Sequence, residues 1–551
     1  MEFKYATIEQ VGLIIKKAKP KNSTGNDILT MKIIKKLCPS ILPHLTHLIN
    51  SIITTEVYPV ILKVSRISPN IKPDKPVEDI DSYRPINNLS VVDKIVEQFF
   101  KDQLNDFVND NNIILEDHHG SRKEHSTLTA LSLLNHKLIN KYHDDHISAV
   151  VQTDLSAAFD TVDHRILLSK LDHYGVRNKE SRILCSFLSN RFQYVSIDTI
   201  KSEVIEALPC SVIQGSKLSA LLYTLYINEV TILHNLMNDN IYSKITGESI
   251  GNITENVEHS IVQYVDDTNN IISSKESKYI QPYIDGYFKL IENFYEINKL
   301  KINPEKSKIM VVCKAARRYE VRNIVINTEK KIIEQVQKLK TLGMYITSGL
   351  SNHANVNNII SKVNFRLSLL KVIFKYAERR TKLILINSII VSVFRYCCPL
   401  LIDSNCSSLN KLQTLLMKCA RTILGFRSLK MTTVKIMNEL NMVTIQHMIV
   451  KESIMFIHKV FFNGGPNVIL KMMTFSLNNN QNIRSVRKPM MVNHHKSQKV
   501  IQSLFYRSIH LYNMLDHDLK LYNPKKLSKH LQKYIQYLFP NNKIPKIETN
   551  K

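Results

Sequence analysis

The chain has 551 residues, of which 44% are hydrophobic, and it carries 74 lysines and arginines against 48 aspartates and glutamates. This length predicts about three or four packed units. With only 13 glycines and 17 prolines, the composition excludes a collagen-like or broadly disordered chain. The net charge of +26 predicts a surface that attracts polyanions, with nucleic acid as the first candidate.

The sequence gives no indication of a secreted, zinc-binding or membrane protein. The eight cysteines form no CxxC pair and no Cys/His cluster at zinc spacing, so ordinary thiols are expected. Glu2 and Lys4 interrupt any apolar run at the start, which argues against a secretory leader. Leu383 to Ile402 has membrane length, but it contains Arg395 and a proline, so we expect a buried helix there.

The N-terminal third predicts helices separated by polar loops. From Thr7 to Ile53 the apolar residues recur at helical spacing and are broken by a polar segment from Pro20 to Asp27, which indicates helix, loop, helix. Pro59 to Pro85 is rich in Pro, Lys and Asp and predicts an extended basic loop suited to phosphate contact. This loop leads into a predicted helix from Asn88 to Leu104.

The central third predicts strands that end at acidic residues. Ser148 to Leu155 indicates a strand, and the pattern from Ser156 to Tyr174 predicts a helix that ends at Gly175. Two β-prone runs, Ile261 to Val265 and Asn270 to Ser273, are separated by Asp-Asp-Thr-Asn and predict a tight hairpin.

The C-terminal third predicts helices and then a basic region. Leu, Ile and Val recur at helical spacing from Val356 to Ile423 and again from Val434 to Phe462. Residues 471–551 are strongly basic with interspersed Tyr and Phe, which fits either a solvated tail or a nucleic-acid contact. The Asn/Gln run from Asn478 to Asn482 is interpreted as a linker.

The acidic residues at the strand ends suggest metal-dependent chemistry. A two-metal nucleotidyl transferase needs carboxylates that converge to hold two Mg²⁺ ions roughly 3.5 to 4 Å apart. Asp154 closes the first strand, and Asp266 and Asp267 are expected in the hairpin turn. Carboxylates held this close repel one another, and a divalent cation removes that repulsion.

The tetrapeptide Tyr-x-Asp-Asp occurs twice and is a weak signal alone. The copy at Tyr264 to Asp267 is flanked by apolar strand residues, whereas the copy at Tyr142 to Asp145 is flanked by Lys, His and Asn. We therefore interpret the copy at Tyr142 to Asp145 as a solvated loop and place the chemistry at Asp266.

Further stretches occur in a fixed order around these residues. Two stretches come before the first acidic strand: Ser82-Tyr83-Arg84-Pro85-Ile86 with Leu89-Ser90, and Gly120-Ser121-Arg122-Lys123 with Ser126-Thr127. Three stretches surround the acidic residues: Asp154 to His164, Gln214-Gly215-Ser216 with Leu218-Ser219, and Tyr264 to Thr268. Two stretches follow: Leu300 to Lys306 and Leu342-Gly343. Together they resemble the two finger motifs and motifs A to E of the reverse transcriptases of non-LTR (LINE-type) retrotransposons, and are similar to the jockey-like elements of animals.

This resemblance implies catalytic roles for the matched residues. Asp154 and Asp266 would be ligands of two Mg²⁺ ions, with Asp267 supporting them. Lys306 matches a candidate general acid that protonates pyrophosphate, although an ordinary exposed lysine would also explain it.

The resemblance also implies nucleotide-binding residues. Arg122, with Lys123 beside it, matches the position that contacts the incoming triphosphate, unless it is simply a surface arginine. Phe159 matches the ring that lies under the deoxyribose and rejects a 2′-hydroxyl, with core packing as the alternative. Gln214 and Gly215 match the template-and-nucleotide platform, where glycine permits close backbone approach.

The sequence departs from the family pattern at several positions without losing a predicted metal ligand. Ser121 stands where the family usually has an aromatic residue, and Ile213 and Ala220 stand where it usually has prolines. Val265 replaces the more usual Ala, and Thr341 stands where the family often has Tyr. No endonuclease-sized region precedes Thr7, so we expect a fragment whose endonuclease activity comes from elsewhere.

We therefore predict an α+β right-hand polymerase with fingers, a palm bearing an antiparallel sheet, and a helical thumb. The predicted division is a helical N-terminal extension (1–65), fingers and palm (66–355), a helical thumb with its adjoining region (356–465) and a basic C-terminal region (466–551). The predicted function is RNA-directed DNA synthesis with an RNA template, a DNA primer or target, and deoxynucleoside triphosphates. The alternative is a catalytically inactive remnant of such an element that still binds RNA.

Overall fold

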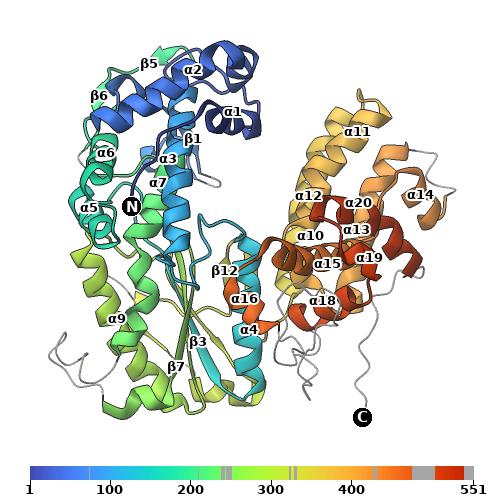
Figure 1. Cartoon of the computed structure of the whole chain (residues 1–551). Coiled ribbons are helices and arrows are strands. Elements are labelled where there is room, and N and C mark those ends of the chain that lie inside the picture. Colours follow the sequence, from blue (N-terminus) through green and yellow to red (C-terminus); the bar gives the residue numbers. More distant parts are fainter. Residues whose placement is uncertain are drawn as a thin grey trace. The chain divides into compact units, whose positions relative to one another are not determined.

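The computed structural model describes residues 1–72, 75–208, 210–237, 242, 251–321, 324–327, 332–425, 431–473 and 503–538. The chain mixes helices with largely antiparallel sheets (Figure 1). It divides into two compact units. Unit 1 comprises Met1–Arg122, Asp154–Met237 and Tyr287–Asn303, and unit 2 comprises Lys123–Thr153, Asn238–Gly286 and Pro304–Lys551. Each unit is thus assembled from segments distant in sequence, and the linear division at residues 65, 355 and 465 stays a prediction.

Unit 1 begins with the predicted helix, loop and helix. Helix α1 (Ile8–Lys17) starts at a capping box in which Thr7 and Gln10 each accept a hydrogen bond from the other's backbone N–H. Helix α2 (Met31–Thr55) starts at Thr30, whose side chain accepts from the N–H of Ile33. The helical prediction for this region is confirmed.

The predicted loop from Pro59 to Pro85 is wrong, because this segment contains a β-hairpin. Strands β1 (Val64–Ile71) and β2 (Tyr83–Asn88) pair antiparallel, with Pro69 opposite Pro85. Proline is tolerated there because β1 contacts its other neighbour, β4, only from Val64 to Ile67. The prolines therefore lie where β1 is paired on one side only.

The rest of unit 1 surrounds this sheet with helices. Strand β4 (Phe192–Ile197) pairs in parallel with β1 and also pairs with the short strands β5 (Ile200–Lys201) and β6 (Ile205–Glu206). The helices of this unit are α3 (Val91–Asp110), α5 (His164–His173), α6 (Asn178–Leu188) and α7 (Lys217–Tyr226). Helix α3 packs against α7, and α5 packs against both α6 and α7.

Unit 2 contains a four-stranded antiparallel sheet in the order β7-β8-β3-β9. Its strands are β7 (Glu258–Tyr264), β8 (Asp267–Ser274), β3 (Ile147–Thr153) and β9 (Lys308–Val312). All seven residues of β3 are buried, as expected for a central strand covered on both faces. Helix α4 (Thr127–His143) packs against β3 and β7. The predicted strand and hairpin are confirmed.

Two small hairpins follow the sheet. They are β10 (Ile326–Asn327) with β11 (Ile332–Ile333), and β12 (Lys338–Thr341) with β13 (Met344–Thr347). Helix α9 (Ile280–Ile297) runs from unit 2 into the last segment of unit 1.

The predicted helical region is confirmed from α10 (His353–Phe374) onward. It continues through α11 (Arg379–Leu385), α12 (Ser392–Arg395), α13 (Cys406–Leu424), α14 (Thr433–Glu439), α15 (Ile445–Asn463) and α16 (Asn467–Met472). The segment from Leu383 to Ile402 is broken into α-helical, π-helical and 3₁₀ turns, and it is only partly buried. Among the described residues, no helix combines the length and the hydropathy that crossing a bilayer requires.

The interpretation of residues 471–551 as a solvated tail is wrong for the part that the structure describes. Helices α18 (Leu504–Asn513), α19 (His517–Lys520) and α20 (Pro524–Leu538) follow, and α18 and α20 pack against α15. Leu527, Leu531 and Ile535 of α20 are at most 1% exposed and belong to the core of the helical region. The predicted linker from Asn478 to Asn482 lies outside the described residues.

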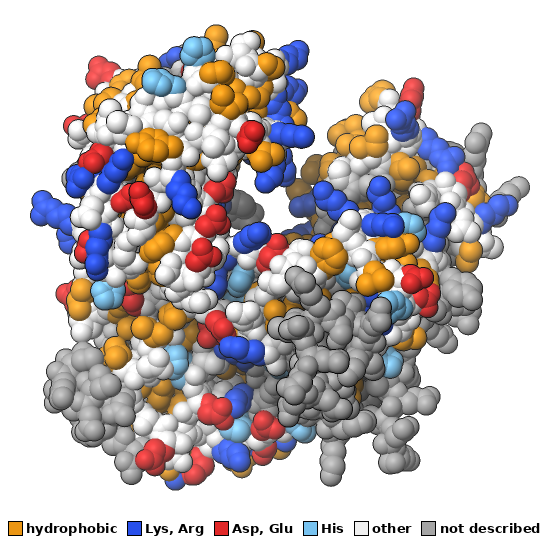
Figure 2. Space-filling view, in the orientation of Figure 1, with side chains coloured by type: hydrophobic (Ala, Val, Ile, Leu, Met, Phe, Trp, Pro, Cys, Tyr) orange, Lys and Arg blue, Asp and Glu red, His pale blue; other side chains and the backbone are white. Residues whose placement is uncertain are grey.

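The surface carries the charge that the composition predicts. Figure 2 shows Lys and Arg side chains exposed over much of this face, with fewer Asp and Glu side chains among them. The cysteines are unpaired thiols, and most are buried or half-buried.

We expect Leu531→Ala to destabilise the chain by roughly 2–5 kcal/mol, because it leaves a cavity in the helical core. Urea unfolding followed by circular dichroism measures this change. Lys533→Ala, on the exposed side of the same helix, is the control and should change the free energy of unfolding by less than about 0.5 kcal/mol. Equal stabilities of the two variants would show that α20 does not pack into the core.

Candidate active site

Asp154 is the residue that follows β3, and the backbone around it is held by a neighbouring segment. Its carbonyl accepts a hydrogen bond from the N–H of Asn303 at 2.8 Å, and the N–H of Ser156 donates to the carbonyl of Lys301 at 2.8 Å. Leu155 and Ile302 form the β-bridge between these two contacts. The Asp154 side chain is half-buried, so the chain presents a fixed carboxylate at the end of a strand.

The β7–β8 hairpin carries the other two predicted metal ligands. Tyr264 pairs with Asp267, so the turn consists of Val265 and Asp266 alone. The expectation that Asp267 lies in the turn is therefore wrong: it is the first residue of β8. Asp266 and Asp267 are both half-buried.

The register of the sheet relates this hairpin to the end of β3. Within unit 2, Thr153 at the end of β3 pairs with Thr268 at the start of β8. Asp267 directly precedes Thr268, and Asp154 directly follows Thr153 along the chain. The chain thus leaves β3 at the end of the sheet where the Val265-Asp266 turn lies.

The turn is strained at Val265. Its φ of +57° is in the left-handed region, where a β-branched residue is a genuine outlier. Such backbone persists only where the surrounding structure determines it, and it is common at functional sites. Gln263 contributes one contact, because its side-chain amide donates to the carbonyl of Val265 at 3.3 Å.

The donor chemistry at this end of the sheet suits Mg²⁺, which prefers carboxylate oxygens. Among the residues described, however, no group of three or more His, Cys, Asp or Glu side chains is placed to hold a metal ion. Mg²⁺ commonly takes one or two protein carboxylates and completes its coordination with substrate phosphates and water. The carboxylates of the β7–β8 hairpin are of the type that such a substrate-completed site uses.

The segment after Asp154 is a turn, whereas a helix was predicted from Ser156. The N–H of Asp160 donates to the carbonyl of Ala157 at 2.8 Å, and Ala157 has a φ of +48°. Helix α5 begins only at His164, because the side chain of Asp163 accepts from the N–H groups of two following residues and caps the helix. This turn separates Phe159 from the helix and leaves it half-buried.

Phe159 stacks on a buried ring. Its centroid is 4.6 Å from that of Tyr223 on α7, with the planes 17° apart. Tyr223 is fully buried, so it supports the inner face of Phe159. The carbonyl of Phe159 also accepts from the N–H of Val212 at 2.8 Å, which joins this turn to the loop before α7.

Gln214 and Gly215 lie in that loop, close to β2. The N–H of Asn87 donates to the carbonyl of Gln214 at 3.2 Å. Gly215 has a φ of +114°, and a Cβ there would lie 2.6 Å from the carbonyl oxygen of Asn87. The side-chain amide of Gln214 is 3.4 Å from both carboxylate oxygens of Asp160, whose pKa burial raises. Phe159, Gln214 and Gly215 are thus brought together within unit 1.

A pocket of about 230 Å³, lined by both apolar and polar residues, opens between this loop and the sheet of unit 1. Its lining includes Asn87, Asp160, Arg191, Gln193 and Gln214. Asn87 was not identified from the sequence, because its importance arises only from the contact with the loop.

A buried acidic pair behind the loop was also missed. Glu97 accepts from the N–H of Lys217 at 2.8 Å and so holds the start of α7. Asp93, one turn earlier on α3, accepts from the hydroxyl of Tyr58 at 2.5 Å and lies 3.9 Å from the guanidinium of Arg191. Burial raises the pKa of both carboxyl groups. The signal in the sequence was two acids four residues apart on the apolar face of a predicted helix.

Arg122, Lys123 and Lys306 are the remaining predicted site residues. The guanidinium of Arg122 donates to the carbonyls of Leu115 at 2.8 Å and His118 at 3.2 Å, and burial lowers its pKa. Lys123 is exposed, and Lys306 is exposed in the turn before β9. Their roles toward a nucleotide stay predictions. In the second Tyr-x-Asp-Asp copy, Tyr142 and His143 end helix α4 where a loop was predicted, and the exposed Asp145 forms an ion pair with Lys314.

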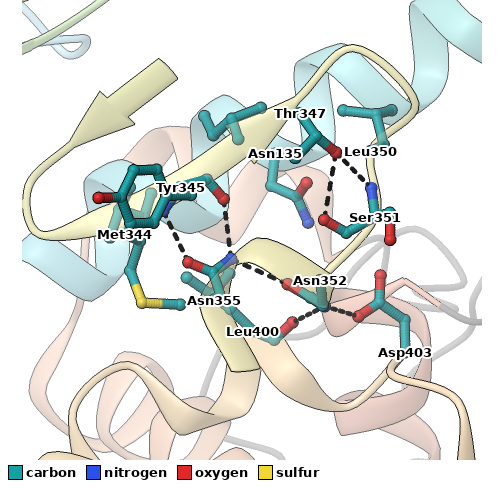
Figure 3. A pocket seen from close by; sticks show the side chains of 12 residues that line it. Asn135, Met344, Tyr345, Thr347, Leu350, Ser351, Asn352, Asn355, Leu400 and Asp403 are labelled. Atoms are coloured by element: carbon teal, nitrogen blue, oxygen red, sulfur yellow. Dashed lines mark hydrogen bonds between the residues drawn. The ribbon is translucent and has the colours of Figure 1, made fainter. Parts of the chain in front are cut away.

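The β12–β13 hairpin is held by the helical region of unit 2. The side chain of Asn355 accepts from the N–H of Tyr345 at 2.6 Å and donates to its carbonyl at 2.8 Å, as a neighbouring strand would. Figure 3 shows Asn355 pointing at Tyr345 and linked to Asn352, which also donates to Asp403.

The turn of the same hairpin has its own contacts. It consists of Leu342 and Gly343, both with positive φ, and the hydroxyl of Tyr396 donates to the carbonyl of Leu342 at 2.5 Å. Thr341, just before the turn, accepts from the side chain of Asn269 on β8 at 3.3 Å. The hairpin turn therefore lies beside the strand that begins with Asp267.

We expect Gly215→Ala to lower the free energy of unfolding by about 1–3 kcal/mol, because the new Cβ meets the Asn87 carbonyl in a backbone conformation that alanine resists. Gly464→Ala is the matched control: Gly464 also has positive φ, but its Cβ would have no atom within 4 Å. Urea unfolding of both variants measures the difference. Equal losses would mean that the contact with Asn87 contributes nothing beyond backbone strain.

The relatives found by comparison with known proteins are RNA-directed DNA polymerases of mobile elements. The chain is 25% identical over 350 residues to a probable RNA-directed DNA polymerase from transposon BS of Drosophila melanogaster, covering 62% of this chain and 36% of that protein. It is 26% identical over 428 residues to the RNA-directed DNA polymerase from mobile element jockey of the same organism, covering 76% and 44%. A probable polymerase from the Drosophila melanogaster X-element is 23% identical over 431 residues.

The chain spans less than half the length of these curated relatives. Residues 71–346 match the family described as reverse transcriptase (RNA-dependent DNA polymerase), and this range includes every predicted site residue. Together with the strand-end carboxylates and the loop around Gly215, this match shows that the chain belongs to the reverse transcriptase family.

Proposed function

We propose that this chain copies the RNA of a non-LTR retrotransposon into DNA by two-metal nucleotidyl transfer. The observation that carries the proposal is the register of the sheet, in which Thr153 pairs with Thr268. In this register, within unit 2, β3 ends beside the start of β8, next to the Val265-Asp266 turn. The match to the reverse transcriptase family and the relatives from jockey, BS and X-element support the choice of reaction.

The carboxylates of Asp154 and Asp266 would hold two Mg²⁺ ions, with Asp267 supporting them. When bound, these ions would lower the barrier to attack by the primer 3′-hydroxyl and stabilise the leaving pyrophosphate. The β3–β8 ladder and the Val265 turn would hold these carboxylates in place. Lys306 would supply a proton to the leaving pyrophosphate.

The residues of unit 1 would select the nucleotide. Phe159 would lie against the sugar, and Tyr223 behind it prevents the ring from retreating when a 2′-hydroxyl approaches. Gln214 and Gly215 would support the template base and the incoming nucleotide, since the missing side chain at Gly215 lets backbone approach closely. Arg122 and Lys123 would contact the triphosphate.

In the right-hand description of polymerases, the sheet β7-β8-β3-β9 would form the palm. The β1–β2 hairpin and its neighbours would form the fingers, and the helices from α10 onward would include the thumb. The partners would be an RNA template, a DNA primer or target, and deoxynucleoside triphosphates.

A second candidate function is RNA binding without catalysis. The observation that favours it is the guanidinium of Arg122, which donates to two backbone carbonyls instead of facing solvent. The departures at Ser121, Ile213 and Ala220 point in the same direction. An assay of DNA synthesis with a metal-ligand variant separates the two functions.

We expect Asp266→Asn to lower primer extension on poly(rA)/oligo(dT) with Mg²⁺ by at least about a hundredfold, because it removes a metal-binding charge worth several kcal/mol in the transition state. Asp145→Asn is the control: this residue belongs to the other Tyr-x-Asp-Asp copy, is exposed and pairs with Lys314. RNA binding should persist in both variants. Undetectable extension by the unmodified chain, with RNA binding intact, would favour the inactive remnant.

We expect Phe159→Val to admit ribonucleotides, since the smaller side chain no longer fills the space beside C2′. Incorporation of riboadenosine and deoxyadenosine triphosphate on a poly(rU) template measures the discrimination, which should fall by about tenfold or more. Tyr223→Phe keeps the stacked ring and should retain discrimination. Unchanged sugar selection in Phe159→Val would assign Phe159 to core packing.

A further inference from the structure

Helix α20 is fixed to the core of unit 2 by one face. Leu527, Leu531 and Ile535 are at most 1% exposed and lie on the side of α20 that packs against α15. The helix begins with Pro524, and the side chain of Asn523 accepts from the N–H of Lys526 at 2.9 Å, which caps it. An anchored helix of this kind presents its opposite face to solvent in a defined orientation.

That opposite face is uniformly basic. Its four exposed lysines, within about 100° of the helix circumference, are Lys525, Lys526, Lys529 and Lys533. The sequence from Leu519 to Leu538 contains no Asp or Glu. In the part of the chain that the structure describes, none of these four ammonium groups forms an ion pair with a carboxylate. We call these residues the α20 lysine face.

The α20 lysine face is destabilising for the helix by itself. Lys525 and Lys529, and then Lys529 and Lys533, are like-charged pairs at i,i+4 spacing, which repel one another. Lys526 is steadied instead by the ring of Tyr522, whose centroid lies 3.8 Å from its ammonium nitrogen. A bound polyanion would convert the repulsion into attraction.

The arrangement of the charges suits an extended partner. Lys525, Lys529 and Lys533 form a row about 12 Å long, because each step of four residues advances roughly 6 Å along the helix. A row of point charges on flexible stems favours a phosphate backbone over one planar carboxylate, and it carries no base specificity. The partner that fits is a nucleic-acid strand bound without regard to sequence.

We propose that the α20 lysine face binds the phosphate backbone of the template RNA. The choice of RNA rests on the proposed function, in which RNA is the strand that the enzyme must hold. Helix α20 lies outside residues 71–346, the range that matches the polymerase family. This contact would keep the template on the enzyme independently of nucleotide addition.

The test is the salt dependence of RNA binding, measured by fluorescence anisotropy with a labelled 30-nucleotide RNA of mixed sequence and without Mg²⁺ or nucleotides. The variant replaces all four lysines of the face by glutamine, which keeps the helix propensity and removes the charge. Each phosphate contact contributes about 0.7 to the slope of log K against log salt for single strands. We therefore expect the slope to fall in magnitude by about 3. The thermal unfolding temperature should not fall, because the substitutions remove like-charge repulsion.

A matched control removes four exposed cations that are already paired with carboxylates. These are Arg177, Arg182, Lys278 and Lys314, whose partners are Asp172, Glu56, Glu276 and Asp145. Replacing them by glutamine should leave the slope within about 1 of the unmodified value. An equal fall in both variants would overturn the proposal, because net charge alone would then explain the binding.

Other results would also overturn it. An unchanged slope in the α20 variant would mean that the face is only solvated. The proposal would also be overturned if the α20 variant lost binding to vesicles of anionic phospholipid, or to duplex DNA, while its RNA binding stayed intact. Because the assay involves no DNA synthesis, its result is independent of the polymerase proposal: a chain that fails to extend a primer can still show the fall in slope, and an active polymerase can fail to show it.

Discussion

The antiparallel ladder between β3 and β8 is the constraint on which the predicted chemistry depends. The two strands pair continuously from Ile147 opposite Ser274 to Thr153 opposite Thr268. A slip of one residue would move every side chain of β3 to the other face of the sheet, and all seven of these residues are buried, so it would change the packing on both faces. Within unit 2, this ladder fixes where β8 begins and therefore where the Val265-Asp266 turn lies.

A second constraint operates in unit 1, where backbone contacts hold the loop before α7. Gly215 lies so close to Asn87 that a Cβ at this position would be only 2.6 Å from the Asn87 carbonyl oxygen. Glu97 accepts a hydrogen bond from the first N–H of α7. Glu97 and Asp93 are buried acids, a costly arrangement that needs compensating hydrogen bonds. These contacts come from α3 and β2. Two elements that carry none of the predicted catalytic residues therefore position the loop.

In the helical part of unit 2, the apolar side chains that stabilise the fold and the charged side chains occupy different places. Its apolar side chains form one core that includes α15 and the C-terminal helices, while its lysines lie outside that core. The same core supports the β12–β13 hairpin through Asn355 and Tyr396. A region rich in positive charge therefore also supports the β12–β13 hairpin, and the two roles use different helices.

The sequence alone determined what depends on local pattern: the helices before Ile53 and after Val356, the buried strand before Asp154, the β7–β8 hairpin and the motifs of the family. Only the tertiary structure decided the β1–β2 hairpin, the late start of α5, the packing of the C-terminal helices and the support given by Asn87 and Glu97. Hydrophobic periodicity and capping residues act over a few neighbours in the chain, so they can be read directly. Strand partners, buried acids and the missing Cβ at Gly215 acquire meaning only through residues far away in sequence, because the contacts that fix them exist only once the chain has folded.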